Sequence, residues 1–316
     1  MSEKENITPV MYAGLPRKGW ENYIVSASDG SYMILISVRE TYRSCLFSLS
    51  YADLKIGGFA HVQEKTFRFF KAPYLTGKSQ SNTYVTWANK NLRFTRVSRE
   101  KNLHLLFSCP SLVLPDGRIG LDASLTLIDN HDTTSYRTDI TSFSRTYPLG
   151  ANTYVTGMAV SGTLRLGNKV SRYRPDEASA IEEKGALRKG HSLRLPTRLY
   201  ASGFHDGTSC TLFLSQPFGR KSSGIGEMCT YNGQVHSLEG AVWHWKEDGR
   251  LQVTCPGLKL DIVFHPAFVV SHSSHGKSQP LQRKMFGHIT GLVNPTGVTP
   301  IPVEGFPGFL EIHPEK

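Results

Sequence analysis

Short stretches of alternating apolar and polar residues run through most of this chain. Between Ser44 and Tyr51 the apolar residues Cys45, Phe47 and Leu49 occupy every second position. Successive side chains of a β-strand point to opposite faces, so a period of two predicts strands with one buried face. The same period recurs at residues 83–87, 92–97, 121–127, 251–255 and 258–264.

Turn signals separate these stretches. Five Asp-Gly or Asn-Gly pairs supply the positive φ angles that two-residue hairpins need, and they are Asp29-Gly30, Asp116-Gly117, Asp206-Gly207, Asn232-Gly233 and Asp248-Gly249. A helical pattern is confined to Asp176 to Leu187, where we expect a short helix after Pro175. The sequence therefore predicts an all-β protein of antiparallel strands with few short helices.

The length of the chain indicates two such units. Its 316 residues are about twice the usual length of one domain, so we expect two β-barrels or curved sheets. The alternation breaks at Tyr147-Pro148-Leu149-Gly150. We place the boundary between Thr146 and Tyr154, which gives predicted domains at 1–150 and 151–316.

The N-terminus is polar and carries both charge signs. No apolar run reaches the ~18 residues of a spanning helix, and none resembles the core of a secretory signal. We expect a cytoplasmic protein without a transmembrane segment. The cysteines are widely spaced and lack a C-x-x-C pair, so we expect free, mostly buried thiols at Cys45, Cys109, Cys210, Cys229 and Cys255.

The formal net charge of +10 raises the question of nucleic acid. Lysine and arginine are spread along the chain, and the densest cluster lies between Lys184 and Arg198. This cluster favours a solvated basic surface, with weak polyanion binding as the alternative. The chain shows no helix-turn-helix, zinc-finger or RNA-binding aromatic signature, so we expect no specific nucleic-acid partner.

Motifs for nucleophilic catalysis and for cofactors are missing from the sequence. It contains no G-x-S-x-G, no P-loop and no G-x-G-x-x-G. His265, His272, His275 and His288 lie in or near a Ser/His-rich segment that does not ensure the tetrahedral convergence of a zinc site. We therefore expect neither a cofactor nor a metal.

An acid and several aromatic residues form the best candidate wall of a ligand cavity. Glu227 and Tyr231 are four residues apart, and Trp243 and Trp245 are two apart, so each pair shares one strand face. We expect the intervening Asn-Gly turn to bring the two strands side by side. A carboxyl against aromatic surface has a raised pKa and can act as a general acid. Alternatively, the tryptophans are core residues and Glu227 closes a hydrogen bond or salt bridge at a strand end.

Four motifs, in order along the chain, carry a resemblance. They are Gly19 to Tyr23 with the strand end Tyr51 to Leu54, Val160 to Gly167, Glu227 to Gly233, and Met285 to Gly291 followed by Gly308 to Glu311. Their order and spacing resemble a bacterial family known as domain of unknown function 2804, over nearly the whole chain. The resemblance implies a two-domain, lipocalin-like architecture similar to that of carotenoid hydratases and related cyclases, with an apolar cavity.

The chain also departs from what the resemblance implies. Such families carry an Asp-Trp-Gly-Arg-Gly segment and a later Trp-x-Trp, whereas this chain has Glu182 to Gly185 and Thr197 to Gly203 at these places. The tryptophans are absent, and the acid is a glutamate. Glu183 is therefore a second candidate acid, and Tyr200 a candidate ligand-binding residue.

The sequence favours a protein that binds a hydrophobic small molecule in a β-barrel cavity. One alternative is a cofactor-free hydratase, isomerase or cyclase acting on a lipid or terpenoid, with Glu227 or Glu183 as proton donor. Another is a structural or interaction protein with a degenerate site. A lined cavity with an inward carboxyl favours the enzyme, a cavity without an acid favours the binder, and a filled core favours the structural protein.

Overall fold

A computed structural model describes residues 18–40, 44–67, 82–99, 102–128, 136–144, 147–187, 197–216, 227–238, 240–272, 282–295 and 297–312. Most of these residues lie in strands, and the one helical element among them is the 3₁₀ turn η1 (Pro256–Leu258). The strands of the first sheet are β1 (Lys18–Ala27), β2 (Tyr32–Glu40), β3 (Ser44–Asp53), β4 (Gly58–Phe67), β5 (Asn82–Ala88), β6 (Arg93–Arg99), β7 (Asn102–Val113), β8 (Ile119–Ile128), β9 (Tyr136–Ser144), β10 (Tyr147–Leu166), β11 (Lys169–Tyr173) and β12 (Ala178–Leu187).

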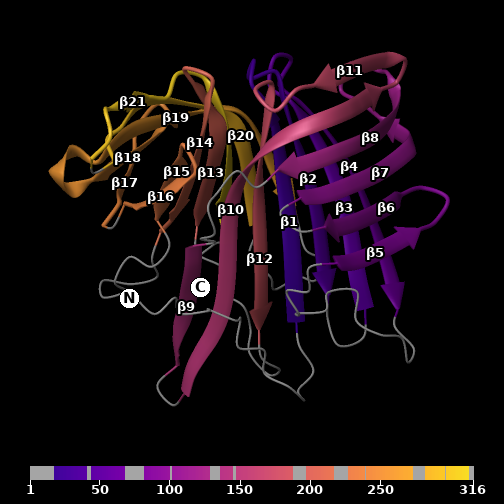
Figure 1. The fold of residues 1–316 in the computed structure, drawn as a ribbon, viewed down its shortest axis with the longest axis horizontal. Coiled ribbons are helices and arrows are strands. Elements are labelled where there is room, and N and C mark those ends of the chain that lie inside the picture. Colours follow the sequence, from indigo (N-terminus) through magenta and orange to yellow (C-terminus); the bar gives the residue numbers. More distant parts are fainter. Residues whose placement is uncertain are drawn as a thin grey trace.

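These strands form one curled antiparallel sheet, the first half-barrel (Figure 1). Their order is β4-β3-β2-β1-β12-β10-β8-β7-β6-β5, with β9 and β11 also paired to β10. The N-terminal strand β1 thus pairs with β12, the last strand of the same sheet. Near the open side, Asn91 Nδ2 donates to Glu64 Oε1 at 2.6 Å, which links the β5–β6 turn to β4.

The second half-barrel is a sheet of the order β16-β15-β14-β13-β22-β20-β19-β18-β17, with β21 on β20. It lies beside the first in Figure 1, coloured orange to yellow. Its strands are β13 (Arg198–His205), β14 (Thr208–Ser215), β15 (Met228–Tyr231), β16 (Gln234–Ser237), β17 (Val242–Trp245), β18 (Leu251–Cys255), β19 (Leu260–His272), β20 (Gln282–Val293), β21 (Ile301–Pro302) and β22 (Phe306–Ile312).

All five predicted turns join consecutive strands, which confirms that part of the sequence analysis. The backbone at Asp206 and Asn232 has a φ of 49°, and the glycine after each also has a positive φ. Two consecutive positive φ angles are what a type I′ hairpin turn requires. The turn residues thereby set the register of the paired strands.

The helix predicted from Asp176 to Leu187 is wrong, because β12 occupies this segment. β12 is a central strand between β1 and β10, and both of its faces are covered. Ala180 packs inside the half-barrel, whereas Ile181 and Glu183 are buried on the other face. A strand buried on both faces shows no alternation, so its sequence lacked the signal that identified the others.

The predicted boundary between Thr146 and Tyr154 falls inside β10, which runs unbroken from residue 147 to residue 166. The C-terminal part of β10 pairs with β8, and its N-terminal part pairs with β9. This exchange of partners lies between Val155 and Ala159, after the break in alternation at residues 147–150. The chain changes sheet later, between Leu187 and Arg198, so the ranges 1–150 and 151–316 do not coincide with the two sheets.

Three groups of buried apolar side chains hold the molecule together. Two of them fill the interiors of the half-barrels. The third group lies between the half-barrels and is called the seam here. Alternate residues of β1 belong to different groups: Tyr23 and Val25 face the interior of the first half-barrel, whereas Ile24 belongs to the seam. The seam residues are Ile24, Met33, Leu35, Ala52, Leu54, Val155 and Ile181 of the first sheet with Tyr200, Phe213, Met228, Phe286 and Phe309 of the second.

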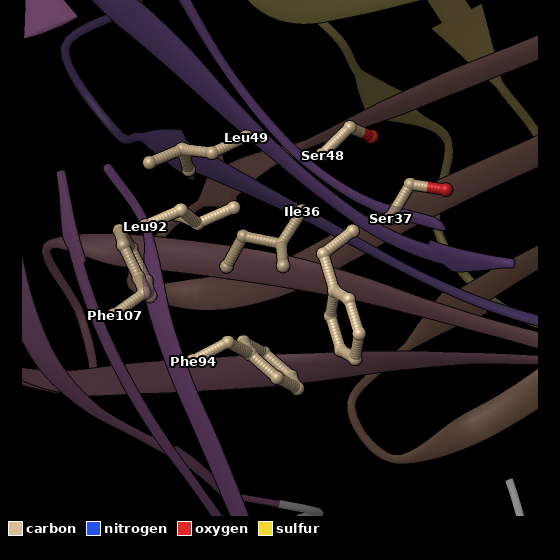
Figure 2. Close-up of a pocket in the computed structure, with 8 residues that line it drawn as sticks. Ile36, Ser37, Ser48, Leu49, Leu92, Phe94 and Phe107 are labelled. Atoms are coloured by element: carbon tan, nitrogen blue, oxygen red, sulfur yellow. The ribbon is translucent and has the colours of Figure 1, made fainter. Parts of the chain in front are cut away.

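The interior of the first half-barrel leaves little room for a ligand. Figure 2 shows Ile36, Leu49 and Phe94 converging there, while the hydroxyls of Ser37 and Ser48 point away from them. The remaining space is about 10 Å³. One water needs roughly 10–15 Å³ and a ligand site roughly 300–1,000 Å³. This cavity therefore does not provide the ligand space that the resemblance implied.

Candidate functional site

Polar residues gather at one end of the seam, where the outer faces of both half-barrels meet. On the first sheet, Asn22 of β1 pairs in register with Glu183 of β12. On the second sheet, Glu311 of β22 pairs with both Arg198 of β13 and Lys284 of β20. The strand registers thus bring together five polar residues that are far apart in the sequence.

Glu183 is the centre of a buried hydrogen-bond network. Its Oε1 accepts from Arg198 Nη1, and its Oε2 accepts from the Tyr200 hydroxyl at 3.0 Å and from Asn22 Nδ2 at 2.7 Å. Asn22 Oδ1 in turn accepts from Ser37 Oγ at 2.6 Å. Buried charges are costly unless they are paired and hydrogen-bonded, and these contacts meet that requirement while joining the two sheets.

Burial and neighbouring charges shift the pKa values of three residues in and beside this network. Burial, together with the adjacent Glu183 carboxylate, raises the pKa of Tyr200 well above its ordinary value, so the phenol stays protonated. Burial acts to lower the pKa of Arg198, but Glu183, Tyr200 and Glu311 together outweigh it and the net direction is upward. Burial lowers the pKa of Lys284 despite the opposing effect of Glu311.

A narrow cleft of about 30 Å³ lies beside the network and is lined by both half-barrels. Across it, Arg39 Nη2 of β2 lies 3.8 Å from Glu311 Oε1. The volume suits one or two water molecules. The lining residues are Asn22, Tyr23, Ile24, Leu35, Ile36, Ser37, Arg39, Ser48 and Ser50 from the first sheet and Tyr200, Lys284, Phe309 and Glu311 from the second.

Aromatic rings form the floor on the side of the second half-barrel. The Tyr200 and Phe309 rings are stacked with centroids 5.7 Å apart, and Phe286 stacks on Phe309 at 5.1 Å. These rings are almost fully buried, and Phe286 does not line the cleft, so they support its floor while the serines and charged groups offer hydrogen bonds. The cleft is therefore suited to water or to one small polar group of a larger molecule.

A second buried ion pair lies on the opposite face of β1. Glu21 Oε1 accepts from Arg96 Nη1 of β6 at 2.5 Å, and Glu21 Oε2 accepts from the Tyr23 hydroxyl at 2.8 Å. This pair crosses the interior of the first half-barrel. Neither Glu21 nor Arg96 lines the cleft.

Glu227 lies just before β15 in the second half-barrel and is 1% exposed. Its Oε2 accepts from the backbone N–H of Ala241 at 2.8 Å, and its carbonyl accepts from the N–H of Leu238 at 3.0 Å. The sheet edges β16 and β17 are consecutive in the chain, and Glu227 holds the segment between them. It does not line the cleft.

The aromatic residues predicted with Glu227 are dispersed. The Asn-Gly turn pairs β15 with β16, so the prediction that it brings β15 beside β17 is wrong. Tyr231 and Trp243 are partly buried against the interior of the second half-barrel, and Trp245 on edge strand β17 is 45% exposed. Of the predicted ligand-binding residues, Tyr200 alone lines the cleft.

The structure describes two of the basic residues in the segment from Lys184 to Arg198. Lys184 Nζ lies 2.7 Å from Glu182 Oε1, and Arg198 is buried in the network. Arg198 is therefore not part of a solvated basic surface. Residues 188–196, which hold the rest of the segment, lie outside the described residues.

The four histidines gave no metal site within the described ranges, where no group of three or more His, Cys, Asp or Glu residues is placed to bind an ion. His265 pairs in register with His288, the side chain of His272 is not described, and His275 lies outside the described residues. The five cysteines are buried free thiols. No helix in the described residues is long and apolar enough to cross a membrane.

Sequence reasoning missed Asn22, Lys284 and Glu311 as site residues and placed Arg198 on the surface. One signal was present: Arg198-Leu199-Tyr200 and Phe309-Leu310-Glu311 each carry a charged residue two positions from an aromatic one in an apolar strand. Such a pair shares one face, so a buried aromatic indicates a buried charge beside it.

Comparison with solved structures supports the predicted lipocalin-like arrangement of two sheets. CghA with Sch210972 has a TM-score of 0.59 at 11% identity, with 95% of this chain and 88% of that chain covered. Kievitone hydratase from Nectria haematococca has a TM-score of 0.53 at 11% identity, with 98% and 94% covered. At these identities the likeness shows the fold alone.

The sequence was also compared with curated proteins and with family models. None of the curated protein sequences matches this chain. A family model described as "Domain of unknown function (DUF2804)" matches residues 3–316.

Proposed function

This chain belongs to the DUF2804 family, and we propose that it is a cofactor-free hydratase or isomerase that acts on a small molecule in the cleft between its half-barrels. The observation that carries the proposal is the buried network of Glu183, Arg198 and Tyr200 beside that cleft. A carboxylate is held inside the protein by three donors, and the tyrosine bonded to it lines the cleft.

Hydration and isomerisation both require a proton to leave one atom and to reach another. Tyr200 donates its own proton to Glu183, and its oxygen accepts a long hydrogen bond from Arg198 Nη1 at 3.4 Å. A phenol oxygen has a second lone pair, and in this scheme that lone pair accepts a proton from a water or a substrate hydroxyl in the cleft. When it does, the phenolic proton passes to Glu183. The reverse transfer returns a proton to the substrate, and no cofactor takes part.

Arg198 and Asn22 act as positioning residues in this scheme. Arg198 stays cationic beside Glu183 and stabilises the carboxylate, whereas Asn22 fixes the orientation of its Oε2. The polar rim and the small volume of the cleft favour a lipid or terpenoid of which only an oxygen-bearing group enters the cleft. The likeness of the fold to kievitone hydratase supports this reaction type at the level of fold.

Native mass spectrometry of protein purified from its own host is the first test, because it identifies a co-purified molecule. The second test is turnover of that molecule by E183Q and Y200F. We expect each variant to lose about 10²–10⁴-fold, the usual contribution of acid–base catalysis. The matched controls are E21Q, in the other ion pair, and Y32F, whose hydroxyl bonds Tyr173 away from the cleft.

The same experiment separates the other two functions. A molecule that binds and is never converted by the wild-type protein indicates a binding protein. A protein that retains and binds no molecule indicates a structural role, which the filled interiors of the half-barrels would then explain. Turnover that survives Y200F contradicts the proton relay.

A further inference from the structure

Lys284 stands out among the charged residues of the cleft. It lies in β20 and makes no hydrogen bond or ion pair with any described residue. Its Nζ lies over the Phe309 ring, 6.0 Å from the ring centroid. The charged groups around it are Glu311 on β22 and Arg39 on β2, and Tyr200 on β13 lines the same cleft. Partial burial of an ammonium is costly without a counter-ion, and the aromatic ring offsets only a part of that cost.

The charges of the lining do not cancel. Arg39 and Lys284 are cations, and Glu311 is the one anion among the lining residues. Behind them, Arg198 and Glu183 neutralise each other. The cleft therefore presents one positive charge more than it presents negative charges, and a charge removed from water is normally paired.

We infer that the molecule bound in the cleft is a monoanion with a carboxylate-type group, and that Lys284 binds this group, with Arg39 on its exposed side. The inference rests on the proposed function for the site itself but not on turnover. The single excess charge and the repulsion of Glu311 disfavour a dianion.

The pKa of Lys284 reports on this binding directly. Lysines are reductively methylated with ¹³C-formaldehyde, and their pH titrations are followed by NMR, with K284R to assign the Lys284 resonance. In the free protein we expect a pKa below that of an ordinary lysine, as burial dictates. Saturating benzoate should raise it by about 1 or more, because an opposite charge within ~4–6 Å favours the charged form.

Three comparisons make the measurement specific. Benzyl alcohol has the ring without the charge and should leave the pKa of Lys284 unchanged. Acetate has the charge, needs less room and should raise this pKa as benzoate does. Lys55 is the matched control lysine, since it is 64% exposed, pairs with Asp29 at 3.2 Å and lies outside the cleft. K284M should weaken benzoate binding at least tenfold, and K55M should not change it.

Several results would overturn the inference. A Lys284 pKa at or above the ordinary value in the free protein would mean that Glu311 already neutralises it. The absence of a response to both benzoate and acetate, or an equal response of Lys55, would contradict a monoanion site. Tighter binding of inorganic phosphate would assign a dianion. If Lys284 responds as expected while E183Q retains turnover, the proposed reaction fails and the anion site stands.

Discussion

Two buried Glu–Arg pairs lie on opposite faces of the same sheet, and each carries a tyrosine. Glu21 pairs with Arg96 inside the first half-barrel, and Glu183 pairs with Arg198 at the seam. In both, a tyrosine hydroxyl donates to the carboxylate. Yet the first pair joins two strands of one sheet across its interior, whereas the second joins the two sheets.

The comparison shows that chemistry alone does not make a site. A carboxylate, a guanidinium and a phenol occur together twice, and in each group the tyrosine alone lines the cleft. The seam group also has Asn22 and Glu311 of the lining as register neighbours, whereas Glu21 and Arg96 cross the interior of the first half-barrel. Placement between two sheets, among further polar lining residues, therefore distinguishes a candidate site from a structural ion pair.

The largest effect should follow from breaking the seam pair. R198M leaves Glu183 fully buried without its counter-ion, and we expect a loss of about 3–5 kcal/mol in the free energy of unfolding. R96M should cost less, since the Glu21 side chain is 10% exposed and that of Glu183 is 0% exposed. Urea denaturation measures both, and the double variant E183Q/R198M should recover much of the loss. An equal cost for R96M would contradict the ranking.

The next largest loss of stability should follow from adding a side chain at a glycine that is packed closely at the seam. A Cβ added at Gly157 of β10 would lie 2.4 Å from Thr211 Oγ1 of β14, and one added at Gly58 would lie 2.3 Å from Pro115 Cβ within the first half-barrel. We expect G157A and G58A each to lower the free energy of unfolding by about 1–3 kcal/mol. Benzoate binding, measured by calorimetry, should change in G157A alone.

The two tyrosines separate function from stability. Y200F and Y23F each remove one hydroxyl from a buried carboxylate, so we expect each to cost about 1–2 kcal/mol in thermal unfolding. Tyr23 also lines the cleft, but its hydroxyl donates to Glu21, which does not, so only Y200F should lose turnover of the co-purified molecule. Equal activity of the two variants would place the chemistry away from the seam.

Glu227 provides a smaller effect. In E227Q the amide oxygen still accepts from the Ala241 N–H, so we expect a loss of about 1 kcal/mol or less in the free energy of unfolding. Ligand binding in the cleft should stay within twofold of the wild type. A tenfold change in affinity would restore Glu227 as a ligand-site residue.

The smallest effect concerns an exposed ion pair far from both networks. Burial raises the pKa of Asp29, but the hydrogen bonds from Ser31 and Lys55 and the Lys55 charge together outweigh it, and the net direction is downward. A lowered pKa contributes stability above the unfolded value of 3.8, and this is lost as the pH falls through the folded value. D29N should therefore cost under about 1 kcal/mol at neutral pH and nothing at low pH, as followed by urea denaturation.

Whether the sequence predicted a strand depended on how many faces of that strand are buried. Strands with one polar face, such as β3 and β8, were predicted from alternation, and the hairpin turns were predicted from Asp-Gly and Asn-Gly pairs. β12 was not, because sheets cover both of its faces. The site was predicted in part: Glu183 and Tyr200 were named, but their partners Asn22 and Lys284 come from strands whose proximity depends on non-local pairing and on packing between sheets.

The pairing of β1 with β12 has a consequence for synthesis on the ribosome. Asn22 and Glu183, which meet in that pairing, are separated by 161 positions. At roughly 5–20 residues per second, β1 emerges about 8–30 s before its partner strand. During that interval β1 and β2 form a hairpin whose outer edge is unpaired, which is the kind of edge that recruits strands from other chains. Nascent chains of this protein should therefore depend on chaperones until β12 emerges.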